Sequence, residues 1–380
     1  MTALAARLSR REGRAVAVAL AVAVFLVSWG AIHHGFYAQP PVIIDTPGYQ
    51  DHGEAILDGQ VPYRDFDVEY PPGALPVFVL PAIRGDYASV FAWLMAALGA
   101  VTVVVVARVR LAAAAFVAVS PLLVGALLLS RFDLWPAALA TAAVVALLEE
   151  RHRLGWSLLG AAVAAKLWPL AIVPVALAWA RRHGQIRAVA WGAAVLALAF
   201  VPFVLVAPGG LWDSISGQLS RPLQIESLGA SFLTTFGDPT VVTSHGSQNI
   251  PGHGWVEATG TAVQITVLVG VWVAAWRRPY DLPRFAAAAT AAFIAFGKVL
   301  SPQFLVWLVP LVPLVRGRRG VAAAAMLVTA LLLTQAWFPR HYWDYVYEGD
   351  LAWVVLARDI ALVALVAVLA LPARVRLRHG

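Results

Sequence analysis

Long apolar segments separated by short arginine clusters constrain this chain more than any other feature. Segments such as 88–107 and 188–207 hold about 20 residues, which is the length a helix needs to cross a bilayer. Of the 380 residues, 61% are apolar and 13% are charged, whereas soluble domains carry about 25% charged residues. A soluble protein of this size needs more polar surface. The pattern predicts an all-α polytopic membrane protein and excludes a soluble enzyme, a disordered chain and a coiled coil.

Seven basic clusters predict the topology. Basic residues accumulate in cytoplasmic loops, so an even number of crossings is expected between neighbouring clusters. About twelve transmembrane segments in a single domain, 1–380, satisfy this condition with both termini in the cytoplasm. The clusters are Arg7/Arg10/Arg11/Arg14, Arg108/Arg110, Arg151/Arg153, Arg181/Arg182/Arg187, Arg277/Arg278/Arg284, Arg316/Arg318/Arg319 and Arg374/Arg376/Arg378. The expected spans are 15–33, 88–107, 111–129, 134–148, 188–207, 259–276, 320–338 and 351–371, with short hairpins at 154–180 and 285–315.

Most acidic residues then fall on the outer face, in two long loops and several turns. The first loop, 34–72, carries seven carboxylates and is expected to contain interfacial helices. The second, 208–258, is rich in turn-forming residues, so we expect a mobile loop that could act as a substrate lid. Residues 73–83 are predicted to form an interfacial or half-inserted helix, because a full crossing there would break the parity.

Asp45 differs from the other acids of the first loop. It follows the apolar pair Ile43-Ile44 and precedes Thr46-Pro47, so it lies where the chain leaves the membrane interface. Tyr49, His52 and Ile56 follow at helical spacing, which predicts a short helix on the membrane surface. Asp45 and Asp51 would then flank one shallow groove.

The two lysines of the chain, Lys166 and Lys298, lie at the outward tips of the two short hairpins. A cation in the membrane is costly and usually has a partner or a function. One interpretation is that both lysines extend to the interface; the other is that they bind an anion there. Arg131, at a third outer turn, could join them or could pair with Asp133. In the last span, Arg358 and Asp359 are expected to satisfy each other.

Carboxylates in an outward groove, with cations at the lipid–water boundary, suit a substrate with a lipid tail, a phosphate and a polar headgroup. Transfer of a sugar from a polyprenyl phosphate needs cations for the leaving phosphate and one general base for the acceptor hydroxyl. A single displacement would invert the anomeric centre. This chemistry needs no metal or other cofactor, and we expect membrane lipids rather than nucleic acid as partners.

Three motifs carry a resemblance to a known family. They are Asp45…Tyr49…Asp51…Gly59…Pro62-Tyr63…Glu69-Tyr70-Pro71-Pro72, then Lys166-Leu167-Trp168-Pro169, and Lys298-Val299-Leu300-Ser301-Pro302-Gln303-Phe304-Leu305-Val306-Trp307. Together they resemble glycosyltransferase family 87, whose GT-C-type members include mannosyltransferases that use polyprenyl-phosphate-mannose and some arabinofuranosyltransferases. They are also similar to the first mannosyltransferase of GPI-anchor synthesis. Family members with established mannosyl transfer carry His after the late Ser-Pro, where this chain has Gln303 and Phe304.

The resemblance implies an inverting, GT-C-like glycosyltransferase of the bacterial inner membrane, with its active site facing outward. The donor would be a polyprenyl-phosphate sugar, with mannose as first choice, and the acceptor an envelope glycolipid or polysaccharide. The expected catalytic residues are Asp45 and, as second choice, Asp51; the donor-phosphate ligands are Lys166, Lys298 and Arg131; the substrate-binding residues are Tyr49, His52, Tyr63, Arg64, Glu69, Tyr70 and Gln303. A lipid or solute transporter is the alternative, although no clear internal repeat supports it. A non-catalytic scaffold is a third possibility.

Overall fold

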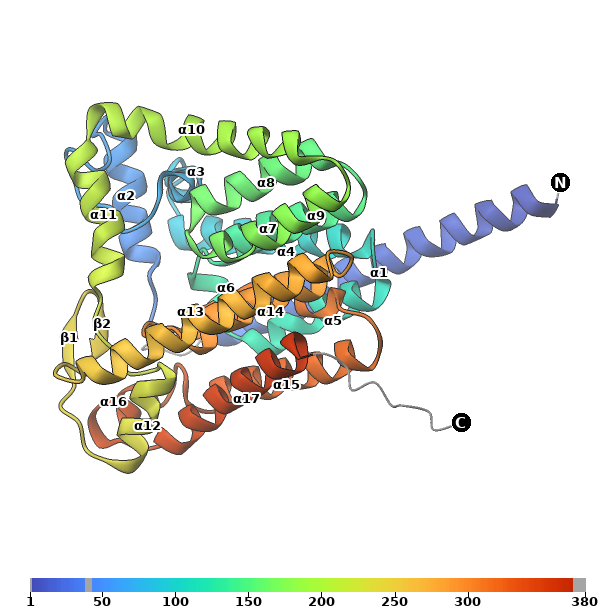
Figure 1. The fold of residues 1–380 in the computed structure, drawn as a ribbon. Coiled ribbons are helices and arrows are strands. Elements are labelled where there is room, and N and C mark those ends of the chain that lie inside the picture. Colours follow the sequence, from blue (N-terminus) through green and yellow to red (C-terminus); the bar gives the residue numbers. More distant parts are fainter. Residues whose placement is uncertain (1, 38–42, 372–380) are drawn as a thin grey trace, which may run out of the picture.

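The computed structural model describes residues 2–37 and 43–371, and helices running between two ends of one bundle dominate it (Figure 1). In this part of the chain, six helices are long and apolar enough to cross a membrane. They are α1 (Thr2–Tyr37), α4 (Tyr87–Ala107), α10 (Val189–Val206), α13 (Gly254–Arg277), α15 (Gly317–Trp337) and α17 (Ala352–Ala370). The expected all-α polytopic fold is therefore confirmed.

Shorter segments fill the space between the long helices. Pro interrupts several of them, because it removes a backbone donor and disfavours helix at the residue before it. The predicted continuous span 111–129 is wrong in detail, since α5 ends before Gly125, whose φ of 65° breaks the helix. The count of twelve crossings stays a prediction. These segments are α5 (Leu111–Val124), α6 (Leu127–Ser130), α7 (Leu134–Leu148), α8 (His152–Ala165), η2 (Trp168–Ala171), α9 (Val173–Arg182), η3 (Ile186–Ala188), α14 (Leu282–Ala295), η4 (Pro302–Trp307) and η5 (Val312–Leu314).

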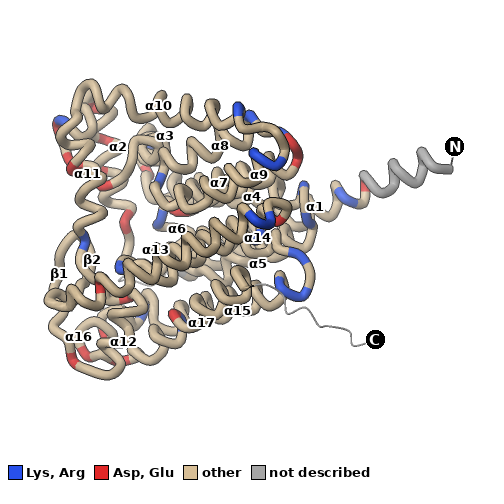
Figure 2. The backbone as a smooth tube through the Cα atoms, viewed as in Figure 1, with Lys and Arg blue, Asp and Glu red and all other residues tan. Residues whose placement is uncertain are grey.

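The arginine clusters share one end of the bundle, as the parity argument predicts (Figure 2). Arg14 donates to the carbonyl oxygens of Ala107 and Arg108, and Arg108 pairs with Glu149 at 2.7 Å. Arg319, in α15, donates to the backbone of Leu371, where α17 ends. The predicted cluster at 374–378 and the side chains of residues 7–11 lie outside the described part. The assignment of this end to the cytoplasm stays a prediction.

The opposite end carries the polar loops. The helix predicted on the surface is α2 (Thr46–Leu57); η1 (Pro72–Ala74) and α3 (Leu75–Ala82) follow it. Tyr49 of α2 stacks on Phe78 of α3, with ring centroids 4.6 Å apart. At 1.5 Å per residue, α3 is far too short to cross a bilayer, which agrees with the expected interfacial or half-inserted helix. Residues 38–42 of the first loop lie outside the described part.

Segment 208–258 contains ordered elements and is not one long mobile loop. The elements are α11 (Pro208–Ser220), α12 (Leu228–Phe236) and an antiparallel hairpin of β1 (Val242–Ser244) and β2 (Ser247–Asn249), in which Val242 pairs with Asn249. The expected turns do form, at 245–246 and 251–252, and the role of the segment as a substrate lid stays a prediction. Backbone bonds hold it: the amide of Gln224 donates to Lys298 and that of Ile225 to Gln248. These long-range partners are invisible in a local sequence pattern.

A buried polar cluster attaches this segment to the membrane helices. Arg358 and Asp359 of α17 form the predicted ion pair, at 2.7 Å, and neither is exposed. Ser231 of α12 donates to Asp359 at 2.7 Å, and Arg358 donates to the carbonyl oxygen of Glu226 at 2.8 Å. Tyr345, in α16 (Tyr342–Glu348), donates to the backbone of the same segment. The segment is therefore fixed on the end of the bundle.

Candidate active site

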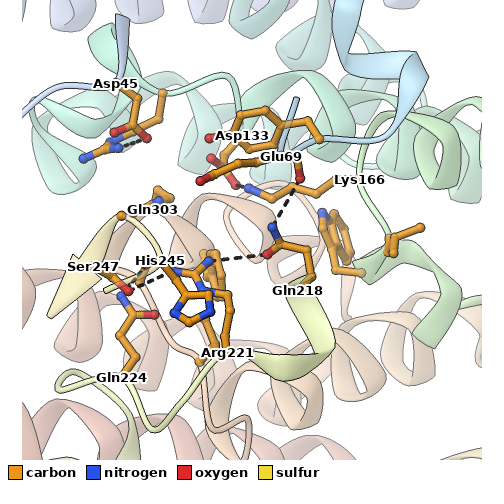
Figure 3. A pocket seen from close by; sticks show the side chains of 18 of the residues that line it. Asp45, Glu69, Asp133, Lys166, Gln218, Arg221, Gln224, His245, Ser247 and Gln303 are labelled. Atoms are coloured by element: carbon orange, nitrogen blue, oxygen red, sulfur yellow. Dashed lines mark hydrogen bonds and ion pairs between the residues drawn. The ribbon is translucent and has the colours of Figure 1, made fainter. Parts of the chain in front are cut away.

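A cavity of about 490 Å³ lies at the end of the bundle opposite the arginine clusters. Distant parts of the chain meet there: the start of α2, the turn before α7, the end of α8, the segment around α11 and the β-hairpin, and the residues that open η4 (Figure 3). Its polar walls include Asp45, Glu69, Arg131, Asp133, Lys166, Gln218, Arg221, Gln224, Glu226, His245, Ser247, Ser301, Gln303 and Tyr342.

Asp45 forms an ion pair with Arg131 at one side of this cavity. The Arg131 side chain is 7% exposed, whereas that of Asp45 is 31% exposed, so the carboxylate is the accessible partner. Tyr49, one helical turn on, donates to the same carboxylate at 3.2 Å. The sequence alternative in which Arg131 pairs with Asp133 is wrong, because the turn before α7 directs Arg131 toward Asp45.

Lys166 pairs instead with Asp133, at 2.6 Å. Asp133 is 1% exposed and also accepts a hydrogen bond from the indole of Trp307 at 2.6 Å. The ammonium of Lys166 lies 4.8 Å from the ring centroid of Phe132 and 5.3 Å from that of Trp307. Lys166 therefore lies against the cavity wall, held by a carboxylate and aromatic rings.

Arg221 is a cation of the cavity that the sequence did not single out. It donates to Ser247 at 3.0 Å and to Gln218 at 3.4 Å, both neutral. In the described residues no carboxylate forms an ion pair with it, and its Nε is buried without a hydrogen-bond partner. Arg221 therefore brings positive charge to the cavity that no neighbouring carboxylate cancels.

The remaining predicted residues divide into two groups. The cavity lining includes Tyr49, Glu69, Tyr70 and Gln303 from that set, and Gln218 donates to the Glu69 carbonyl oxygen at 3.2 Å. It does not include Asp51, His52, Tyr63, Arg64 or Lys298. The expectation of one groove flanked by Asp45 and Asp51 is thus met at Asp45 alone.

Four of these five residues outside the lining, namely His52, Tyr63, Arg64 and Lys298, have other contacts. His52 packs on Phe66 and Phe78, and this burial lowers its pKa. Tyr63 donates to the Tyr70 carbonyl oxygen at 2.6 Å. The other two are charged: Arg64 pairs with Asp65 at 2.9 Å, and Lys298 lies 3.9 Å from Glu257.

Glu226, Gln224 and Tyr342 line the cavity and were missed. Glu226 is 2% exposed, and burial raises its pKa to about 7. Its position between Ile225 and Ser227, in a segment read as loop, gave no local signal that it would be buried. His245 lines the cavity whereas His253 does not. In the part of the chain that the structure describes, no three His, Asp or Glu side chains gather as metal ligands would.

The structure is a polytopic helical bundle with a cavity at one end, and it has the GT-C fold of the solved structure that it resembles. The structure is similar to the crystal structure of ArnT from Cupriavidus metallidurans bound to undecaprenyl phosphate, with a TM-score of 0.50 and 16% sequence identity, over 93% of this chain and 76% of that one. No curated protein matches the sequence.

The sequence model of glycosyltransferase family 87 matches residues 69–302, which is more than half of the chain. The protein therefore belongs to glycosyltransferase family 87. This membership confirms the expected enzyme class, a GT-C-type glycosyltransferase that depends on a lipid-phosphate sugar.

Proposed function

We propose that the protein transfers a sugar from a polyprenyl-phosphate donor to a hydroxyl of an envelope glycolipid or polysaccharide, at the outer face of the bacterial inner membrane. Mannose is the first choice of sugar. One observation carries the proposal: a single cavity holds an accessible carboxylate, Asp45, together with two cations, Lys166 and Arg221, and borders exposed apolar side chains.

The apolar side of the cavity suits the lipid tail. Leu170 is 50% exposed and Leu219 is 71% exposed, and both belong to the cavity lining. Large exposed apolar side chains on a membrane helix bundle make favourable contact with lipid. A polyprenyl chain can therefore stay in the bilayer while its phosphate reaches the polar walls. The undecaprenyl phosphate named for the ArnT structure supports this class of donor.

Arg221 and Lys166 are the proposed phosphate ligands. The leaving phosphate gains negative charge as its bond to the anomeric carbon breaks, and fixed cations stabilise that charge. Asp133 compensates much of the charge of Lys166. Arg221 therefore provides most of the positive charge that is available to the phosphate. Arg221 replaces Lys298 in this role, because Lys298 lies outside the cavity lining. Arg131 acts on the donor only indirectly, since Asp45 neutralises it.

Asp45 is the proposed general base. The guanidinium of Arg131 and the hydroxyl of Tyr49 both favour its ionised form. The acceptor oxygen forms a bond to the anomeric carbon, the bond from that carbon to the phosphate oxygen breaks, and the acceptor proton passes to Asp45. The phosphate leaves from the face opposite the acceptor, so the anomeric configuration inverts.

Purified protein in lipid vesicles tests this function directly. Radiolabelled polyprenyl-phosphate-mannose and polyprenyl-phosphate-arabinose are supplied in turn, with a crude envelope-lipid acceptor. We expect labelled product from one donor, with an inverted anomeric centre. A transporter would instead move the labelled lipid between leaflets without forming product, and that result would contradict the proposal.

A further inference from the structure

Three polar atoms in the segment from Arg221 to Glu226 are buried without a hydrogen-bond partner in the described residues: Nε of Arg221, Oε1 of Gln224 and Oε2 of Glu226. All three residues line the cavity. Gln224 and Glu226 are each 2% exposed. Buried polar atoms are nearly always paired in native proteins, so such a group calls for an explanation.

Hydrogen bonds to distant parts of the chain hold this segment in place. The Gln224 amide donates to the backbone of Lys298 at 2.9 Å, and its Nε2 donates to Ser301 at 2.8 Å. The side chain also interacts with the Glu226 carboxyl, while its Oε1 acceptor has no hydrogen-bond partner among the described residues. The Glu226 carbonyl oxygen accepts from Arg358 at 2.8 Å. These bonds hold the polar atoms of the segment at the cavity wall.

The chemistry of these atoms selects the ligand. An amide oxygen and a carboxyl oxygen accept hydrogen bonds, so they match hydroxyl groups and repel the oxygens of a phosphate. Arg221, three residues before Gln224, offers an unpaired donor that suits the phosphate instead. A sugar attached to a phosphate has hydroxyl groups next to phosphate oxygens. The segment has the matching groups, with acceptors on Gln224 and Glu226 next to the donor on Arg221.

We propose that Gln224 and Glu226 bind hydroxyl groups of the donor sugar, next to the phosphate on Arg221, and so determine which sugar is transferred. This inference rests on the proposed function and assigns the sugar subsite within it. Tyr342 is close enough to the Glu226 carboxyl to interact with it. The Glu226 carboxyl can accept a hydrogen bond from a sugar hydroxyl.

A binding measurement with two lipids isolates the sugar contribution. The full-length protein in lipid nanodiscs is titrated with polyprenyl-phosphate-mannose and with polyprenyl phosphate that carries no sugar. We expect Glu226→Ala to weaken binding of the sugar-bearing lipid by about tenfold or more, because charged or buried hydrogen bonds contribute on that scale. Binding of the sugar-free lipid should stay within about twofold of wild type. Gln224→Met should behave the same way. Arg221→Gln should weaken binding of both lipids.

Glu257→Gln is the matched control, because Glu257 is an outer acid that does not line the cavity. If Glu226→Ala does not fold, Glu226→Gln keeps the shape and should lose discrimination between the intact donor and donors that lack one hydroxyl. Equal weakening of both lipids, or of neither, would overturn the sugar subsite while leaving the proposed function standing. A wild-type protein that binds neither lipid would overturn the proposed function and the subsite with it.

Discussion

The two lysine-containing hairpins look alike in sequence and differ in the fold. Each places a lysine between apolar helices, three or four residues before a proline. Lys166 ends α8, pairs with the buried Asp133 at 2.6 Å and lines the cavity. Lys298 follows α14, lies 3.9 Å from Glu257 and is outside the lining. The same local pattern therefore yields one lysine in the site and one beside it.

The partner decides this difference. Asp133 is 1% exposed and bonded to Trp307, so a cation must reach inward to pair with it. Glu257 is 25% exposed, so water already solvates it and the attraction on Lys298 is weaker. Lys166 is therefore held by a buried carboxylate, and Lys298 only by a partly exposed one.

The largest expected effect comes from removing the buried carboxylate. Asp133→Ala leaves Lys166 buried without its counter-charge and should destabilise the protein by about 3–5 kcal/mol. Thermal unfolding in detergent measures this loss. The double variant Asp133→Leu with Lys166→Met should recover much of the stability but not donor binding. Recovery of both would show that this pair is only structural.

Sugar transfer separates the two lysines most clearly. Lys166→Met should reduce the transfer rate by about 100-fold or more, as loss of a cation facing a developing charge does. Lys298→Met should reduce it by less than about threefold, since its pair is partly solvated. Equal losses of transfer rate in the two variants would mean that the two lysines contribute equally, whether or not they line the cavity.

Glu226 offers a pH test of burial within the same cavity. Its pKa rises from 4.5 to about 7 on folding. Between these values the unfolded carboxyl is ionised while the folded one keeps its proton, so stability falls as pH rises from about 4.5 to about 7 and stays lower above. Arg131, Arg358 and Tyr342 face this group.

Glu226→Gln should therefore show a smaller fall in melting temperature than the wild type between pH 5 and pH 8. Melting curves recorded across that range at constant ionic strength check this. Parallel pH profiles for the two proteins would mean that the Glu226 carboxyl has an ordinary pKa in the fold.

The smallest effect is expected at Lys298. A double-mutant cycle with Lys298→Met and Glu257→Gln should give a coupling below about 1 kcal/mol, because both side chains are about one quarter exposed. Unfolding of the four proteins under one condition provides the cycle. A coupling as large as that between Lys166 and Asp133 would remove the contrast between the hairpins.

The fold was largely predictable because membrane physics acts locally. The apolar lengths fixed the long helices to within a few residues at α4 and α17, and the arginine clusters indicated a shared end. Asp45 was found because its position at the loop entrance is a local signal. Arg221 and Glu226 were not, since their burial depends on contacts with Ser247, Lys298 and α17, all distant in sequence.

The central claim, that Asp45 is the base of this cavity, is tested most directly by comparing Asp45→Asn with Asp51→Asn. Both acids belong to the segment between α1 and α3, but of the two only Asp45 lines the cavity. Sugar transfer and donor binding are measured on each variant in lipid vesicles. We predict that Asp45→Asn loses transfer by about 1,000-fold while still binding donor, and that Asp51→Asn stays near wild type. Transfer that survives in Asp45→Asn, or that disappears in Asp51→Asn, would contradict the claim.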